Sequence, residues 1–163
     1  MIGKNLEICI NSDNLISLPI NLNSAFIGGA KRVELCSAMH LDGLTPESTA
    51  IKMCAQQIPA HGELLVMIRP AANKFTVNKT LLNTMISQII SAADLGATGV
   101  VFGAICGSEV DINATQQLVS CAQKHGLKTT FHRAFDCISN KQQAIKQLID
   151  LGIDRVLTNG NHW

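Results

Sequence analysis

The chain has 163 residues, of which 47% are hydrophobic and 15% are charged, and its formal net charge is +1. This length is sufficient for one domain with a substantial core. The near-zero charge and the lack of a basic run argue against nucleic acid as a partner. No apolar run approaches the roughly 18 residues of a membrane span, and residues 1–5 carry no signal-peptide hydrophobic segment. We therefore expect a cytoplasmic protein with no membrane partner.

The N-terminal half is expected to alternate between strands and helices. Residues 6–10 alternate between apolar and polar side chains, which is typical of a strand with one buried face. Thr45 as N-cap and Pro46 at the first helical position predict the start of a helix. The expected elements are, in chain order, a strand at 6–10, a helix ending at Gly28 and Gly29, a strand at 32–36, a helix to about residue 57, and a strand at 64–69.

The C-terminal half continues the same alternation with clearer helix boundaries. Asn78 and Asp111 are suitable N-caps, and glycines follow the last apolar residue of each helical pattern. The expected elements are a helix from Asn78 to Gly96, a strand at 100–102, a helix from Asp111 to Gly126, a strand at 129–131, a helix from Ser139 or Asn140 to Gly152, and a strand at 155–158.

Regular alternation of strand and helix predicts an α/β fold with a parallel sheet. A doubly wound sheet usually carries a glycine-rich phosphate loop after its first strand, and residues 9–13 contain no glycine. Polar side chains on one face of the first two strands suit a barrel, whose inward residues line the mouth of an active site. We therefore expect a (β/α)8 TIM-barrel type of fold that is incomplete, with about six strands and five helices.

Two Glu-x-Cys pairs, Glu7 with Cys9 and Glu34 with Cys36, are the first candidate site. Period-2 geometry places each pair on one strand face, and neighbouring strands bring the two pairs side by side. Two thiolates suit Cu(I), and less specifically Zn(II). The alternative is that both cysteines are small buried hydrophobes. The other four cysteines show no CxxC spacing and are expected to be free thiols.

A polar cluster after the fifth strand is the second candidate site. His132, Arg133 and Asp136 follow a β-prone run directly, and Arg69 ends the third strand. One interpretation is an anion or small-molecule site in which Glu7 or Glu34 acts as acid or base and the arginines bind the anion. His132 would then be a general acid/base or a metal ligand, and Asp136 would orient Arg133 or cap the next element. The other interpretation is a structural ring of salt bridges inside the barrel.

Five short motifs occur in order along the chain, at residues 32–36, 43–46, 67–70, 101–104 and 131–136. With these motifs the chain resembles the CutC family, described as copper-homeostasis proteins with a TIM-barrel fold, over essentially its whole length. The resemblance implies a cytoplasmic, copper-associated protein in which Cys9 and Cys36 match the cysteines proposed as copper ligands. No reaction is firmly attached to the family.

The chain departs from the family pattern in three places, one of which is a first loop and helix that look several residues longer than usual. After Arg69 and Pro70 the family usually reads Arg-Gly-Gly-Asp-Phe, whereas residues 71–75 read Ala-Ala-Asn-Lys-Phe, so one arginine and one aspartate are missing. Family members also continue for two more βα units. We therefore expect one CutC-like TIM-barrel domain over residues 1–163 that lacks the last two units. Its unpaired edge strands invite association into a homo-oligomer.

The leading functional prediction is a copper-binding protein of copper homeostasis that holds Cu(I) through Cys9 and Cys36. The first alternative is a TIM-barrel enzyme that acts on a small anionic substrate with Glu7, Glu34, Arg69, His132 and Arg133. The second alternative is a truncated product with no function of its own.

Overall fold

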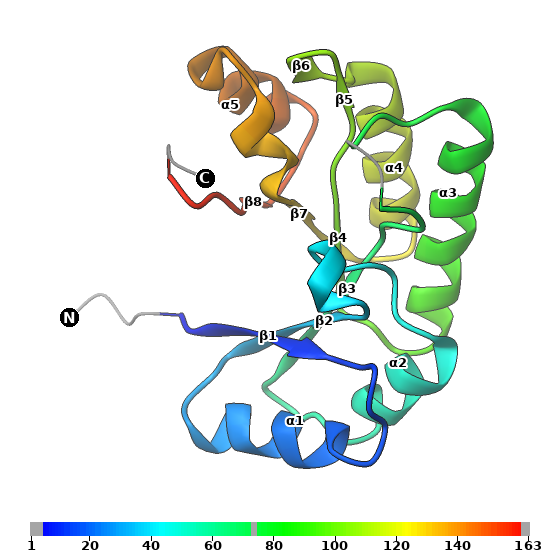
Figure 1. The fold of residues 1–163 in the computed structure, drawn as a ribbon, viewed down its shortest axis with the longest axis vertical. Coiled ribbons are helices and arrows are strands. Elements are labelled where there is room, and N and C mark those ends of the chain that lie inside the picture. The colour runs from blue at the N-terminus through cyan, green and yellow to red at the C-terminus, as the bar shows by residue number, and fades with distance from the viewer. Residues whose placement is uncertain (1–4, 73–74, 161–163) are drawn as a thin grey trace.

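The computed structural model describes residues 5–72 and 75–160. Within these residues a parallel sheet of six strands runs in the order β1-β2-β3-β4-β7-β8. The sheet curls, its helices cover the outer side, and its open side lies on the left of Figure 1, between β1 and β8. The arrangement is that of a partial TIM barrel, as the alternation of elements predicts.

The observed elements follow the predicted order closely. The strands of the main sheet are β1 (Glu7–Asn11), β2 (Arg32–Cys36), β3 (Glu63–Met67), β4 (Gly99–Phe102), β7 (Lys128–Phe131) and β8 (Arg155–Val156). The α-helices in the described ranges are α1 (Leu18–Ile27), α2 (Ser48–Ala55), α3 (Lys79–Asp94), α4 (Ile112–Lys124) and α5 (Lys141–Asp150). The sequence did not predict the short hairpin of β5 (Ile105–Cys106) and β6 (Glu109–Val110), or the 3-10 turns η1 (Met39–Leu41) and η2 (Arg133–Cys137).

The two faces of the sheet bury different sets of side chains. Outward residues such as Val33, Leu64 and Val66 belong to the large core between the sheet and its helices. Inward residues such as Leu65 and Met67 form a separate, smaller cluster on the concave face. This alternation confirms the period-2 interpretation of the strands, because successive side chains of a strand point to opposite faces.

Three helix starts confirm the capping predictions. The side chains of Asn78, Asp111 and Asn140 each accept a hydrogen bond from the backbone N–H three residues later, at 2.8, 2.9 and 3.0 Å. Each bond satisfies one of the amide groups that a helix leaves unpaired at its N-terminus. Of the two residues considered for the start of α5, Asn140 is therefore the cap.

The predicted start of α2 is wrong. The helix begins at Ser48 after Glu47, and the Thr45 side chain is used elsewhere. Its hydroxyl accepts a hydrogen bond from the backbone N–H of Arg69 at 2.8 Å and donates to Oε1 of Gln88 at 2.9 Å. A tertiary contact at the end of β3 therefore replaces the local cap, and the loop before α2 stays extended.

Strand ends also differ from the prediction. The third strand ends at Met67 instead of residue 69, and β8 ends at Val156 instead of residue 158. Ile68 and Leu157 still donate to the neighbouring strands, and loop contacts begin one or two residues later. The N–H of Arg69 donates to the Thr45 hydroxyl at 2.8 Å, and that of Asn159 donates to Asp136 at 3.2 Å. Polar side chains at these positions therefore belong to the loops at the carboxyl ends of the strands.

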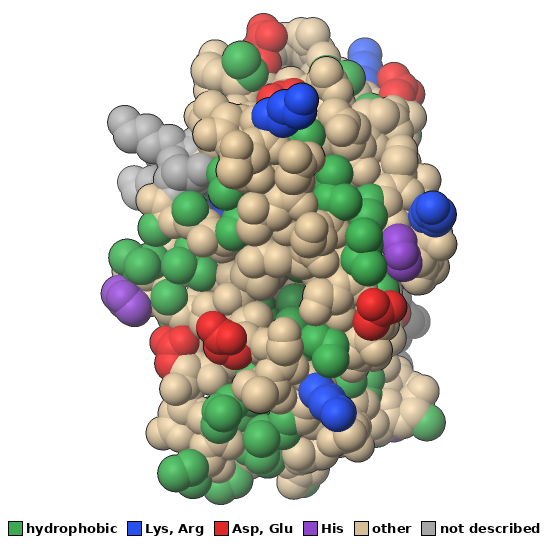
Figure 2. All heavy atoms as spheres, turned by 90° about the vertical axis from the view of Figure 1, so that its right-hand side faces the viewer, with side chains coloured by type: hydrophobic (Ala, Val, Ile, Leu, Met, Phe, Trp, Pro, Cys, Tyr) green, Lys and Arg blue, Asp and Glu red, His purple; other side chains and the backbone are tan. Residues whose placement is uncertain are grey.

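On the face shown in Figure 2, charged side chains do not gather into a patch of one sign. Basic and acidic side chains are scattered over this helix-covered face (Figure 2). Among the helices of residues 5–72 and 75–160, none has the length and apolar content needed to span a membrane.

Candidate metal centre

The register between β1 and β2 decides which polar side chains meet on the concave face. Glu7 lies opposite Arg32, and Cys9 lies opposite Glu34. Asn11, in turn, lies opposite Cys36. The expectation that the two Glu-x-Cys pairs lie side by side is therefore wrong in register, although all four residues share one face. Cys36 lies two residues further along the sheet than Cys9, so the two thiols contact each other diagonally across the neighbouring strands.

Three sulfur atoms meet at the carboxyl ends of β1 and β2. The Sγ atoms of Cys9 and Cys36 are 3.6 Å apart, and Sγ of Cys9 lies 3.8 Å from Sδ of Met39. Sulfur ligands at about 2.3 Å from a tetrahedral ion lie about 3.8 Å from one another, so these separations suit one shared metal ion.

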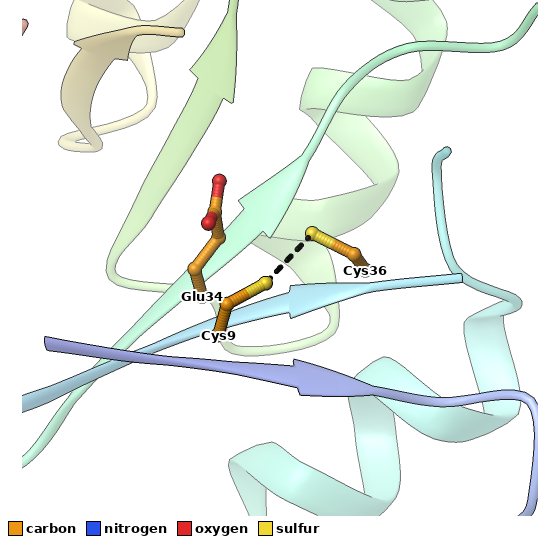
Figure 3. A group of neighbouring side chains, drawn as sticks. All are labelled: Cys9, Glu34 and Cys36. Atoms are coloured by element: carbon orange, nitrogen blue, oxygen red, sulfur yellow. Dashed lines mark hydrogen bonds between the residues drawn. The ribbon is translucent and has the colours of Figure 1, made fainter. Parts of the chain in front are cut away.

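Glu34 lies next to the two thiols. One ligand atom from each of Cys9, Glu34 and Cys36 falls within a group whose members are all within 4.8 Å of one another. The three side chains rise from the same side of the two strands, and the sulfur atoms point toward each other (Figure 3). Thiolates are soft ligands and suit Cu(I) or Zn(II), whereas a carboxylate suits a harder ion.

Met39 is a site residue that the sequence analysis missed. It lies in η1, which follows β2 after Ala38 adopts a left-handed backbone with φ of 46°. The Ala38 N–H donates to Oδ1 of Asp13 at 2.9 Å, which holds the turn against the loop after β1. The spacing Cys36-x-x-Met39 was a visible signal, because a thioether three residues from a thiol is a second soft ligand on one loop.

The buried groups of this site favour their protonated forms in the absence of a cation. The pKa of the Cys36 thiol is raised by its hydrogen bond with Cys9, by burial and by the charge of Glu34. Burial raises the pKa of Glu34 to about 7, while a hydrogen bond with Cys9 lowers it and the charge of Glu7 raises it. Metal binding must therefore displace the proton of the Cys36 thiol.

Glu7 belongs to a chain of ion pairs at the other end of the strands. Arg32 Nε lies 2.7 Å from Oε2 of Glu7 and 3.8 Å from Oε2 of Glu63. Arg155 Nη1 of β8 lies 3.5 Å from the same Glu63 oxygen, so the chain crosses the concave face from β8 to β3. Glu7 is therefore paired with Arg32 and not with Arg69, Arg133 or His132 of the second candidate site.

Arg69 holds the loop that carries Met39. Its guanidinium Nη1 donates to the carbonyl of Leu41 at 2.7 Å and to that of Gly43 at 2.9 Å. Its guanidinium carbon also lies 4.9 Å from the centre of the Phe75 ring. These contacts give Arg69 a role in positioning η1, and its predicted role as an anion ligand stays a prediction.

His132 is buried in a neutral form. Its exposed fraction is 3%, and burial together with the charge of Arg69 lowers its pKa to about 3. Nδ1 accepts a hydrogen bond from the N–H of Ala134 at 3.2 Å, so the ring proton resides on Nε2. A Cβ atom at Gly103 would lie 2.4 Å from Nδ1, which explains why β4 is followed by glycine at this position.

Asp136 joins the loop after β7 to the segment after β8. Its Oδ2 lies 3.8 Å from Nε of Arg133, and its carboxylate also accepts hydrogen bonds from the Thr158 hydroxyl and the Asn159 N–H. Of the two roles considered for Asp136, the contacts therefore support the orientation of Arg133.

A cavity of about 410 Å³ lies inside the curl of the sheet and brings most of the predicted site residues together. The predicted residues in its lining are Glu7, Cys9, Glu34, Cys36, His132 and Arg133. Two other predicted residues, Arg69 and Asp136, lie outside this lining and act on it through the η1 loop and through Arg133. Met39 and Phe75 are lining residues that the sequence did not single out.

The curated relatives of this chain described next carry the same family name. A protein named "family protein CutC" from Glaesserella parasuis is 43% identical over 156 residues, which cover 95% of this chain and 60% of the relative. Its counterpart from Aliivibrio fischeri is 39% identical over 156 residues, with the same coverage. The chain thus spans about 60% of the length of these curated relatives.

Solved structures agree with the fold. The crystal structure of the putative copper homeostasis protein CutC from Streptococcus agalactiae matches with a TM-score of 0.83 and 31% identity, over 96% of this chain and 74% of that one. A xylose isomerase domain containing protein from Salmonella typhimurium shares the fold alone, with a TM-score of 0.60 and 15% identity over 96% of this chain and 61% of that one. The sequence model of the CutC family matches residues 4–163. The chain therefore belongs to the CutC family.

Proposed function

We propose that this protein binds one Cu(I) ion as cargo through Cys9 and Cys36, with Met39 as a third ligand, and that it serves copper homeostasis in the cytoplasm. The observation that carries the proposal is the contact of three sulfur atoms, 3.6 and 3.8 Å apart, at the edge of one cavity. Soft thiolate and thioether ligands select Cu(I), and a reducing compartment keeps both thiols available.

The ligand set supports copper more than zinc. Structural zinc sites have four ligands, most often cysteine and histidine. In the described residues the group of possible metal ligands at this site contains Cys9, Glu34 and Cys36, and no histidine joins it. The name of the Streptococcus agalactiae relative, a putative copper homeostasis protein, points in the same direction.

The test is an anaerobic titration of the reduced protein with Cu(I) in competition with a chromogenic Cu(I) chelator. We expect one tightly held ion per chain. The double variant Cys9→Ser, Cys36→Ser should lose this ion, because hydroxyl groups are poor ligands for Cu(I). Cys106 and Cys137 are exposed and lie outside the site, so the double variant Cys106→Ser, Cys137→Ser is the matched control and should retain it. Equal stoichiometry in the two double variants would contradict the proposal.

The charges of the cavity give less support to an enzyme with a small anionic substrate. Three carboxylate residues, Glu7, Glu34 and Asp42, line the cavity, whereas Arg133 is the cationic side chain among the described lining residues. Because Glu7 is paired with Arg32, the repulsion of an anion would come from Asp42 and from ionised Glu34, and the attraction from Arg133.

The sheet edges support a second, independent proposal about partners. Among the described strands, β1 pairs with β2 alone and β8 pairs with β7 alone, so each presents a free edge. Two exposed isoleucines, Ile20 at 65% and Ile27 at 78%, lie on α1, the helix that contacts β1. We propose that these edges let the chain associate with itself. Light scattering at micromolar concentration should give a mass above that of one chain, and a concentration-independent monomer mass would contradict this.

A further inference from the structure

The cavity beside the sulfur atoms is much larger than a metal ion needs. Its volume is about 410 Å³, whereas a water molecule occupies roughly 30 Å³ of liquid. Pockets of about 300–1,000 Å³ typically bind small organic molecules. A copper ion held by Cys9, Cys36 and Met39 would occupy one corner, so the remaining lining groups raise the question of a second occupant.

One wall of the cavity offers a buried acceptor. Glu34 is 5% exposed, and within the described part of the chain its Oε1 atom has no hydrogen-bond partner. Buried polar atoms are almost always paired, so an oxygen in this position calls for a donor from a bound molecule. Asp42 lies on the lining too and adds negative charge, whereas the charge of Glu7 is paired with Arg32.

The wall formed by the end of β7 offers a buried donor. The Nδ1 atom of His132 accepts from Ala134, which leaves the proton on Nε2. The Nδ1–Cε1 edge of the ring packs against Gly103, and the ring lines the cavity. Of the two ring nitrogens, Nδ1 is therefore the acceptor and Nε2 the donor. Arg133, which follows directly, adds positive charge to this wall.

We propose that the cavity binds a small zwitterion, an α-amino acid or a short peptide, with its amino group at Glu34 and its carboxylate at His132 and Arg133. A simple anion would leave the Glu34 acceptor unpaired, and a simple amine would leave the His132 donor unpaired. A zwitterion satisfies both walls at once. The inference goes beyond the copper site, because it uses the oxygen and nitrogen groups of the cavity and none of its sulfur atoms.

The test uses the full chain, reduced and free of metal, and isothermal titration calorimetry. The probes are the standard amino acids and glycylglycine at millimolar concentration. Propylamine, propionate and inorganic phosphate, which carry only one of the two charges, are the comparison probes. We expect saturable binding of at least one zwitterion and binding that is roughly tenfold weaker or undetectable for each comparison probe.

Two variants locate the binding site. His132→Phe removes the donor and should weaken binding of the zwitterion by roughly tenfold or more. His61→Phe, an exposed histidine outside the cavity, is its matched control and should bind as the unmodified protein does. Because His132 is buried and its replacement can impair folding, Leu157→Phe offers a second route. It fills the cavity from a lining position, leaves both polar walls in place, and should abolish binding.

Three results would overturn the inference. These are no binding of any zwitterion, binding of propionate or phosphate that equals the best zwitterion, and full affinity in a folded Leu157→Phe variant. The Leu157→Phe variant should still bind one Cu(I) ion per chain, because it changes none of the sulfur ligands. Loss of copper binding and loss of zwitterion binding can therefore be observed separately.

Discussion

The two ends of the concave face use the same strands in opposite ways. At the amino ends, Glu7, Arg32, Glu63 and Arg155 form ion pairs that connect β1, β2, β3 and β8. At the carboxyl ends, the Glu34 oxygen Oε1 finds no partner in the described chain, and the thiols of Cys9 and Cys36 meet each other. The inward polar residues thus stabilise the fold at one end and remain available to ligands at the other.

The boundary between these ends is sharp. Glu7 and Cys9 lie two positions apart on one strand, or about 7 Å, yet of the two side chains Glu7 alone forms a described ion pair. The difference teaches that an inward position alone does not identify a site residue. What identifies it is whether the strand opposite supplies a partner for the buried polar atom.

The largest expected effect at the carboxyl ends of the strands is a loss of stability at acid pH, caused by His132. Its folded-state pKa of about 3 lies below the ordinary 6.5, so the unfolded state takes up the proton first as the pH falls. The contribution of His132 to the free energy of unfolding is complete above pH 6.5. Below that pH it decreases by about 1.4 kcal/mol per pH unit. Between pH 6.5 and pH 4 the loss should be about 3 kcal/mol.

Urea unfolding at pH 7 and pH 4 measures this loss. The His132→Phe variant should lose about 3 kcal/mol less than the unmodified protein over the same interval, because it has no group to protonate. The exposed His61→Phe variant should behave like the unmodified protein. An equal loss in the His132→Phe variant would mean that this histidine does not stay neutral in the folded state.

The next effect concerns Glu34, for which stability depends on pH in the opposite direction. Its pKa of about 7 lies above the ordinary 4.5, so the folded state holds the proton more tightly and stability decreases as the pH rises from 4.5 through 7. Replacement by glutamine, Glu34→Gln, should therefore stabilise the metal-free protein at pH 8 by about 2 kcal/mol and have little effect at pH 4.5. Thermal unfolding at both pH values tests this, and a destabilised variant at pH 8 would contradict it.

The smallest effect comes from the opposite end of the sheet. Arg32→Ala removes the partner of Glu7, and the loss should be about 1 to 2 kcal/mol, between the values typical of exposed and buried ion pairs. Glu7 and Glu63 keep 23% and 42% side-chain exposure, and water can solvate them in part. Copper binding should remain within about twofold, since Arg32 contacts none of the sulfur atoms. Urea unfolding and a Cu(I) titration give the two values, and a strong loss of copper affinity would break the division between the two ends.

Part of this arrangement could be predicted from the sequence because it depends on local geometry. The inward placement of Glu7, Cys9, Glu34 and Cys36 follows from the alternation of a strand. The N-cap roles of Asn78 and Asp111 follow from local backbone bonding.

Other parts depend on contacts between distant segments. The two-residue stagger of β1 and β2 is set by how the loop and helix between them return, and neither strand encodes it alone. Thr45 looks like an N-cap, but its hydroxyl bonds Arg69 and Gln88 from elements that come later in the chain. Met39 reaches Cys9 only because Ala38 turns the chain back over the end of β1.

The central claim, that the carboxyl ends of β1 and β2 form a sulfur site for copper, is tested most directly by X-ray absorption spectroscopy of the Cu(I)-loaded protein. We expect the first coordination shell of copper to contain sulfur alone, with three sulfur atoms in the unmodified protein and two in the Met39→Leu variant. Leucine conserves the volume of Met39 and removes its sulfur, so the fold should be unaffected. A shell dominated by nitrogen or oxygen, or one that persists unchanged in the Cys9→Ser, Cys36→Ser protein, would contradict the account.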